Sequence, residues 1–398
     1  MFEHLQIYDT RERLIVGAAD LLLAGAGPLL RRSASRRRGV APERILALRL
    51  ERIGDLVMTL GALAALRARA PDAAIHLVVG SWNESIARSL PDVTTVETVD
   101  VPWLARHAAG EAPVALVKRA LAWRSRRFDL AVNFEPDIRS NFLLALSGAP
   151  VRVGFSSGGG TAFLTAAVPY EPHRHTAVNA LRIVDLACPA AAGTSSTARL
   201  SPPARAREEA GLLLNSLGIP AGRPVVGIHP SGGRQVKQWH LDRFAEVAGR
   251  LAREQSAAIV LTGAPEDRAV VDGVAARLPP DVRAFDLARP MALDVFAAVI
   301  ERLAVLVSGD TGPMHLAAAV GTPVVAFFGP SDPARYGPLD DRARVITADL
   351  WCRPCNRVRR PPERCSHGVP DCLTGIDVET VYRAASALLP PATDRGHG

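Results

Sequence analysis

Several familiar signatures are missing from this 398-residue sequence. No Gly-x-Gly-x-x-Gly follows the first predicted strand of either half, which argues against an NAD-dependent oxidoreductase. Aromatic residues make up only 5% of the chain and do not interleave with its basic clusters, so we do not expect a nucleic-acid partner. The net charge of +7 is concentrated in residues 31–38 and 355–365. This placement favours an anionic membrane surface or a phosphorylated acceptor as the partner.

A long hydrophobic run is also missing. The apolar stretch 14–30 has 17 residues and is interrupted by Asp20, so it is marginal as a membrane span. Acidic residues precede it and no small-residue cleavage site follows, which is unlike a secretory signal. We expect an amphipathic helix that either packs on its own domain or lies in a membrane interface. The expected location is the cytoplasm, with peripheral attachment at the inner face of the inner membrane.

What the sequence does contain is a repeated alternation of short apolar runs and helical segments. The first series includes 45–50, 74–80, 128–134 and 151–155, and the second includes 224–230, 257–263, 282–287, 304–310 and 323–329. Such alternation predicts two parallel sheets in an α/β protein, each doubly wound. We expect an N-terminal extension (1–44), a first domain (45–190), a linker region (191–222), a second domain (223–375), and a C-terminal helix and tail (376–398).

Polar motifs follow several of these strands, where parallel sheets bind their ligands. Arg52, Gly54 and Asp55 stand where the first strand turns into a helix. Asp55 can cap that helix, or it can act as a general base, and the local sequence does not decide between the two. In the second half, a glycine turn with Ser231 and Gly232 precedes Lys237, and could cradle a diphosphate or be an ordinary solvated loop.

Two further motifs lie in the second half. Glu266, after the next strand, could bind ribose hydroxyls or stabilise a helix N-terminus. The stretch "VLVSGDTGPMHLAAAVGTPVVAFFGPSDP" places Asp310, Thr311 and Gly312 at a helix start that could receive an anion. His315 follows on that helix, as a packing residue or as part of the same opening.

Taken together, the Arg-x-Gly-Asp turn, the lysine loop, the Gly-x-x-Glu pair and "GDTGPMHLAAAVGTPVVAFFG" resemble glycosyltransferase family 9. The resemblance covers about residues 44–385 and implies a GT-B fold with two Rossmann-like domains facing a cleft. It also implies an inverting, metal-independent transfer of heptose from ADP-heptose to lipopolysaccharide core or another envelope glycan, with no cofactor. The implied partners are a nucleotide-sugar donor and a lipid-linked or phosphorylated glycan acceptor.

The resemblance also implies roles for individual residues. Asp55 would be the base and Arg52 would lie on the acceptor side. Lys237 would pair with the departing diphosphate and Glu266 would hold the ribose. The remaining donor-side residues would frame the diphosphate and the sugar: Ser231, Gly232, Asp310, Thr311, Gly312 and His315. The alternatives are another nucleotide sugar, a nucleotide-sugar epimerase, or a binding protein without catalysis.

Four of the five cysteines lie close together in the sequence, as Cys352, Cys355, Cys365 and Cys372. This spacing can make a structural zinc or iron site with thiolate ligands. His367 is a competing ligand, and free or redox-labile thiols are the alternative. Disulfides are disfavoured if the protein stays in a reducing compartment.

Overall fold

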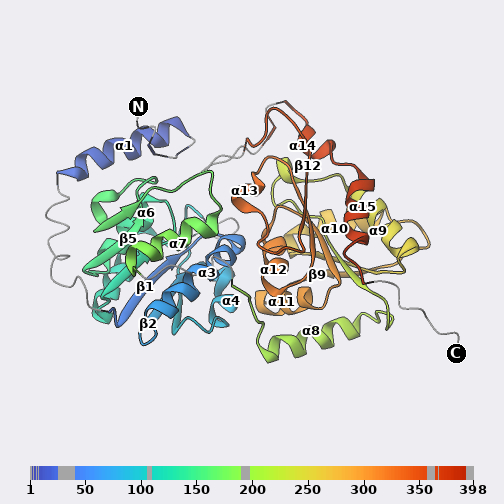
Figure 1. Ribbon diagram of the computed structural model, residues 1–398, viewed down its shortest axis with the longest axis horizontal. Coiled ribbons are helices and arrows are strands. Elements are labelled where there is room, and N and C mark those ends of the chain that lie inside the picture. Colours follow the sequence, from blue (N-terminus) through green and yellow to red (C-terminus); the bar gives the residue numbers. More distant parts are fainter. Residues whose placement is uncertain are drawn as a thin grey trace. The chain divides into compact units, whose positions relative to one another are not determined.

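The computed structural model describes residues 2, 4, 5, 7, 9–25, 41–104, 110–189, 198–355, 364, 365 and 367–390. The chain divides into two compact units, unit 1 (1–198 with 358–360) and unit 2 (199–357 with 361–398) (Figure 1). Each unit is built on one six-stranded sheet. The strand pairs of both sheets are parallel. This confirms the predicted α/β class.

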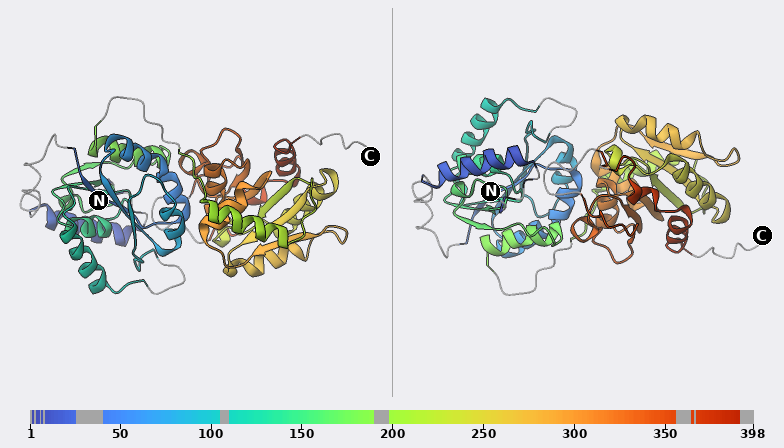
Figure 2. Two further views of the ribbon diagram at one scale, coloured as in Figure 1. Left: turned by 90° about the horizontal axis from the view of Figure 1, so that it is seen from below. Right: turned by 90° about the horizontal axis from the view of Figure 1, so that it is seen from above.

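In unit 1 the strand order is β3-β2-β1-β4-β5-β6. The strands are β1 (Arg44–Arg49), β2 (Ala74–Val79), β3 (Thr95–Thr98), β4 (Leu130–Asn133), β5 (Val151–Phe155) and β6 (Ala166–Val168). The α-helices are α1 (Thr10–Ala24), α3 (Ile53–Arg69), α4 (Glu84–Arg88), α5 (Pro113–Ala122), α6 (Ile138–Leu146) and α7 (Thr176–Ala187). Helices cover both faces of the sheet (Figure 2), and side chains of α5 and α6 share a core with β1 and β4.

In unit 2 the strand order is β12-β11-β10-β7-β8-β9. The strands are β7 (Val225–His229), β8 (Ala258–Gly263), β9 (Ala284–Ala288), β10 (Val305–Gly309), β11 (Val324–Phe328) and β12 (Arg344–Thr347). The α-helices are α8 (Ala204–Ser216), α9 (Leu241–Glu254), α10 (Arg268–Ala275), α11 (Leu293–Glu301), α12 (Gly312–Val320), α13 (Pro333–Tyr336), α14 (Asp371–Thr374) and α15 (Val378–Ser386). Short 3-10 turns η5 (Gln235–Lys237) and η6 (Pro265–Asp267) follow β7 and β8.

The central strands are buried because they are apolar on both sides. In unit 2, α9, α14 and α15 share one core with the sheet, and α8 and α11 share a second core with β8 and β9. Helix α8 lies within the stretch that the sequence suggested as a linker. It belongs to unit 2 because Ala206 and Ala210 are fully buried in that second core.

Three strands were absent from the sequence prediction: β3, β6 and β12. Each is the outermost strand of its sheet. Such strands have one paired edge and little burial, so they lack the continuous apolar run that reveals a central strand. None of the helices described by the structure is long and apolar enough to cross a membrane.

Candidate functional site

Both sheets have a point at which the chain reverses its direction of progress across the sheet. In unit 1 it falls between β1 and β4, and in unit 2 between β7 and β10. The loops that leave the carboxyl ends of two such strands run in opposite directions and open a crevice, which is where doubly wound sheets bind ligands. Most of the residues predicted for the site follow one of these four strands, while Glu266 follows β8, the neighbour of β7.

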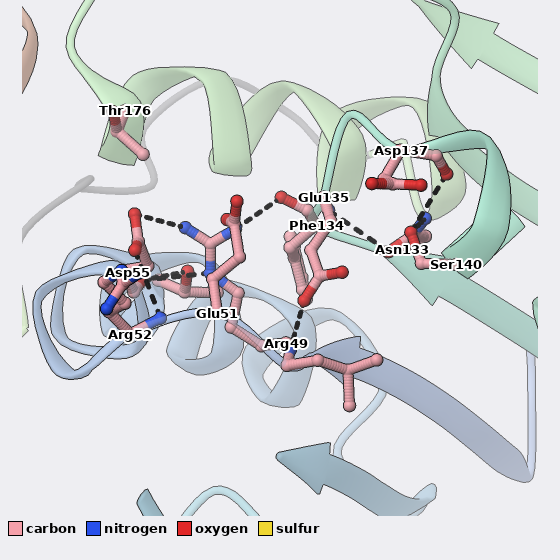
Figure 3. Close-up of polar contacts among 12 residues, drawn as sticks. Arg49, Glu51, Arg52, Asp55, Asn133, Phe134, Glu135, Asp137, Ser140 and Thr176 are labelled. Atoms are coloured by element: carbon pink, nitrogen blue, oxygen red, sulfur yellow. Dashed lines mark hydrogen bonds and ion pairs between the residues drawn. The ribbon is translucent and has the colours of Figure 1, made fainter. Parts of the chain in front are cut away.

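In unit 1 the centre of this edge is Arg49, the last residue of β1, which is only 2% exposed. Its guanidinium donates to the carbonyl oxygen of Phe134 at 2.7 Å and to Glu51 Oε2 at 2.8 Å (Figure 3). It also donates to the carbonyl oxygen of Asp55 at 3.1 Å and to Asp55 Oδ1 at 3.3 Å. One buried arginine therefore ties the end of β4 to the start of α3.

Asp55 lies in the first turn of α3 and keeps 24% of its side chain exposed. Its Oδ2 accepts the backbone N–H of Arg52 at 3.2 Å, so Asp55 does make a capping hydrogen bond at the start of the helix. Because Oδ1 faces Arg49, the carboxylate is held from both sides while part of it reaches solvent. Capping and a role as base are therefore compatible at this position. Arg52 itself is exposed at the helix start.

Two further acids belong to this cluster, and the sequence analysis missed both. Glu135 follows β4, is 1% exposed, and accepts the backbone N–H of Leu50 with Oε1. Its Oε2 is buried without a hydrogen-bond partner among the described residues. Burial raises the pKa of Glu135 to about 7, helped by repulsion from Asp137 and Asp55 and opposed by Arg49.

Glu51 is the second of these acids. Burial and repulsion from Asp55 raise the pKa of Glu51 to about 8, against the attraction of Arg49. Glu51 keeps 31% of its side chain exposed, so water reaches it more easily than Glu135. Two features of the sequence could have pointed to this cluster of acids. They are the charged residue inside the apolar run "LALRL" and the acids of "FEPD" directly after a buried strand.

In unit 2 the structure brings Lys237 and Asp310 together. Lys237, in η5 after β7, forms an ion pair with Asp310, which follows β10. The side chains are only 15% and 9% exposed. Burial favours the neutral acid, yet the pKa of Asp310 is lowered, because Lys237 and a hydrogen bond from Ser331 stabilise the carboxylate. The pair spans the reversal point of the sheet.

The glycine turn before Lys237 folds tightly against it. A Cβ atom at Gly232 would lie 2.5 Å from the carbonyl oxygen of Lys237, so only glycine fits without a shift. Ser231 Oγ donates to Asp267 Oδ1 at 2.6 Å, and Asp267 Oδ2 accepts the N–H of Ala264 at 2.9 Å. Asp267, also missed by the sequence analysis, therefore joins the loops after β7 and β8.

The other predicted donor residues lie around the same edge. Thr311 precedes α12 and its hydroxyl contacts Ser308 Oγ at 2.9 Å. The N-cap residue Thr311 makes no side-chain capping hydrogen bond to the first turn of α12, where Gly312 stands, so the start of this helix can receive an anion. His315 is 7% exposed and lies within electrostatic range of Asp310. Glu266 is exposed in η6 and forms no hydrogen bond or ion pair with another described residue.

The described residues do not show the metal site predicted at the cysteine cluster. All four cysteines belong to the described residues and are free thiols, of which Cys372 is buried. Burial and the proximity of the other three raise the pKa of Cys372 to about 11, which favours the protonated thiol. Within the described part of the chain, no three residues of the types Cys, His, Asp and Glu are arranged to hold one ion.

This arrangement can be compared with known proteins. Lipopolysaccharide heptosyltransferase 2 of Escherichia coli is 26% identical over 85% of this chain and 96% of its own length. The crystal structure of a family 9 glycosyltransferase from Veillonella parvula superposes with a TM-score of 0.76 at 25% identity, over 87% of this chain and 97% of that one. The structure of E. coli ADP-heptose lipopolysaccharide heptosyltransferase II gives a TM-score of 0.70 at 22% identity, over 87% and 98%.

These similarities confirm the GT-B architecture that the sequence motifs implied. The family model for glycosyltransferase family 9 (heptosyltransferase) matches residues 116–365, which is more than half of the chain and includes all of β7 to α12. The chain therefore belongs to glycosyltransferase family 9 and is a glycosyltransferase.

Proposed function

We propose that this protein transfers a heptose from ADP-heptose to a lipopolysaccharide-core or other envelope glycan, with inversion and without a metal ion. The observation that carries the proposal is the buried Lys237–Asp310 pair at the reversal point of the unit 2 sheet. The name of the E. coli relative and the motif resemblance support heptose as the sugar.

On the donor side, the chemistry requires positive charge where the ADP leaves. Breaking the bond between the sugar and the diphosphate places extra negative charge on the phosphate oxygens. Lys237 and the uncapped start of α12 supply an ammonium and backbone N–H groups for that charge. Asp310 fixes the ammonium in place before the donor arrives, which reduces the reorganisation needed during reaction. Glu266, exposed after β8, would accept hydrogen bonds from the ribose.

On the acceptor side, Asp55 would accept the proton of the attacking hydroxyl. The hydroxyl oxygen then forms the new bond to the anomeric carbon as the bond to ADP breaks, and this single displacement inverts the configuration. Arg49 holds Asp55 Oδ1 and Arg52 N–H holds Oδ2, so the carboxylate is oriented before the acceptor binds. Arg52, exposed at the start of α3, would contact the acceptor.

The test measures ADP release from ADP-heptose in the presence of a lipopolysaccharide-core acceptor, for the wild type and Asp55→Asn. Asparagine has the same shape and can still accept the Arg52 N–H, but it cannot take a proton. We expect turnover to fall by roughly 10²- to 10⁴-fold while ADP affinity stays unchanged.

Asp72→Asn is the matched control, because Asp72 is exposed in the turn before β2. It should retain wild-type turnover. Full activity in Asp55→Asn would contradict the assignment of the base. ADP release that needs an added divalent cation would contradict the metal-independent mechanism.

A further inference from the structure

Helix α1 attaches to unit 1 through its polar side. Asp9 caps its first turn by accepting the N–H of Glu12 at 2.7 Å. Asp20 Oδ1 accepts the backbone N–H of Gly160 at 2.6 Å. Glu12 lies 3.9 Å from Arg139 of α6. Near these polar contacts Val16 is buried in a small apolar cluster with Leu5 and Ile7.

The opposite side of α1 is apolar and exposed. Its large aliphatic residues are Leu14 (43% exposed), Ile15 (62%), Leu21 (67%) and Leu22 (83%). At 3.6 residues per turn, these four and Ala18 fall within roughly 120° of the helix circumference. A helix that packs only on its own domain turns its apolar stripe inward, whereas α1 turns this stripe outward. Figure 2 shows α1 lying lengthwise across the surface of unit 1.

Positive charge lies on this face at Arg11 and in the sequence that follows the helix. Arg11 is exposed and lies on the same side of the helix as the aliphatic residues. The sequence that follows α1 contains "RRSASRRR" at 31–38, and no acidic residue occurs between Asp20 and Glu43. Arginines attract anionic lipid headgroups, while aliphatic side chains enter the boundary between headgroups and acyl chains. A second copy of the chain would bring the same excess of arginine against this one, which disfavours self-association through this surface.

We propose that the outer face of α1, formed by Arg11, Leu14, Ile15, Ala18, Leu21 and Leu22, docks on the surface of an anionic lipid bilayer. The helix lies in the interface and does not cross it. Gly160, which α1 contacts, follows β5, and Arg139 also pairs with Asp137 in the loop after β4. The docking face thus belongs to the same edge of the unit 1 sheet as Asp55. A lipid-linked acceptor, which belongs to the function proposed above, would lie at the same bilayer surface, but the docking itself does not depend on that function.

The experiment is co-sedimentation of the full chain with vesicles of phosphatidylcholine alone and of phosphatidylcholine mixed with phosphatidylglycerol. We expect binding to the anionic vesicles that weakens with salt, and much weaker binding to the neutral ones. The double variant Ile15→Gln/Leu22→Gln leaves Val16 and Asp20 in place, so α1 should stay attached. Its binding to anionic vesicles should fall by about 10-fold or more, with thermal unfolding and ADP affinity unchanged.

Leu212→Gln is the matched control, because Leu212 is 66% exposed on α8 of unit 2. It should bind vesicles like the wild type. The proposal is overturned if the wild type does not bind anionic vesicles, or if the double variant binds as well as the wild type. It is also overturned if sedimentation equilibrium shows that the wild type self-associates through this face and the double variant does not, with no vesicle binding by either.

Discussion

At the scale of single residues, the buried acids of unit 1 are the least expected finding. Glu135 has a pKa of about 7 in the folded protein, above the ordinary value of 4.5. Between these two values the folded state keeps a proton that the unfolded state releases. The contribution of Glu135 to the free energy of unfolding is therefore largest below about pH 4.5. It falls as the pH rises toward 7 and changes little above that.

Glu135→Gln tests this account. Glutamine still accepts the Leu50 N–H but cannot ionise, so the variant should gain stability relative to the wild type as the pH rises from 5 to 8. A relative gain of about 1 kcal/mol would shift the unfolding midpoint by about 2–4 °C. Thermal unfolding at several pH values measures it. Glu84→Gln, at a glutamate that is 42% exposed, should show no such trend. A pH-independent difference for Glu135→Gln would contradict the account.

At the scale of elements, the short segment from the end of β7 through η5 carries Ser231, Gly232 and Lys237 of the proposed donor site. Gly232→Ala should push this loop away from Lys237, because the new Cβ would meet the Lys237 carbonyl carbon and oxygen at 2.6 and 2.5 Å. We expect ADP affinity to fall by about 10-fold or more, because a loss of about 1.4 kcal/mol in binding free energy already lowers affinity tenfold. Gly211→Ala within α8 is the control and should bind ADP normally. Equal affinity in both variants would show that the loop does not bind the diphosphate.

The strands and the loops that follow them show how much of the fold and the site the sequence could predict. Central strands such as β7 and β10 were found within one residue at each end because they are apolar and flanked by turn residues. The predicted donor residues follow these strands, so their gathering at one edge followed from topology alone. The acids of "FEPD" marked the end of a strand, but the contacts of Glu135 and Asp267 join loops that are distant in the sequence, so their place in the site became visible only in the structure. The metal site predicted at the four cysteines stays a prediction, because their spacing in the sequence does not fix how the thiols converge.

At the scale of the whole molecule, each unit has its own sheet and its own hydrophobic cores. ADP should therefore protect unit 2 from hydrogen exchange and leave unit 1 nearly unchanged. We expect the strongest slowing in residues 229–237, 263–267 and 309–315. Residues 49–55 and 133–138 of unit 1 should exchange as without nucleotide. Protection confined to unit 1 would reverse the assignment of donor and acceptor sides.

Calorimetric titration with ADP, UDP and GDP tests most directly whether the Lys237–Asp310 pair forms a diphosphate-sugar site. Lys237 and Lys118 are the only lysines in the chain, and Lys118 is exposed on α5. We expect selective binding of ADP, weakened by about 10-fold or more in Lys237→Ala and in Asp310→Ala, because each loses a charge-assisted contact. Lys118→Ala should bind like the wild type. Absence of binding by all three nucleotides, or unchanged ADP affinity in Lys237→Ala, would contradict a diphosphate-sugar site at the Lys237–Asp310 pair.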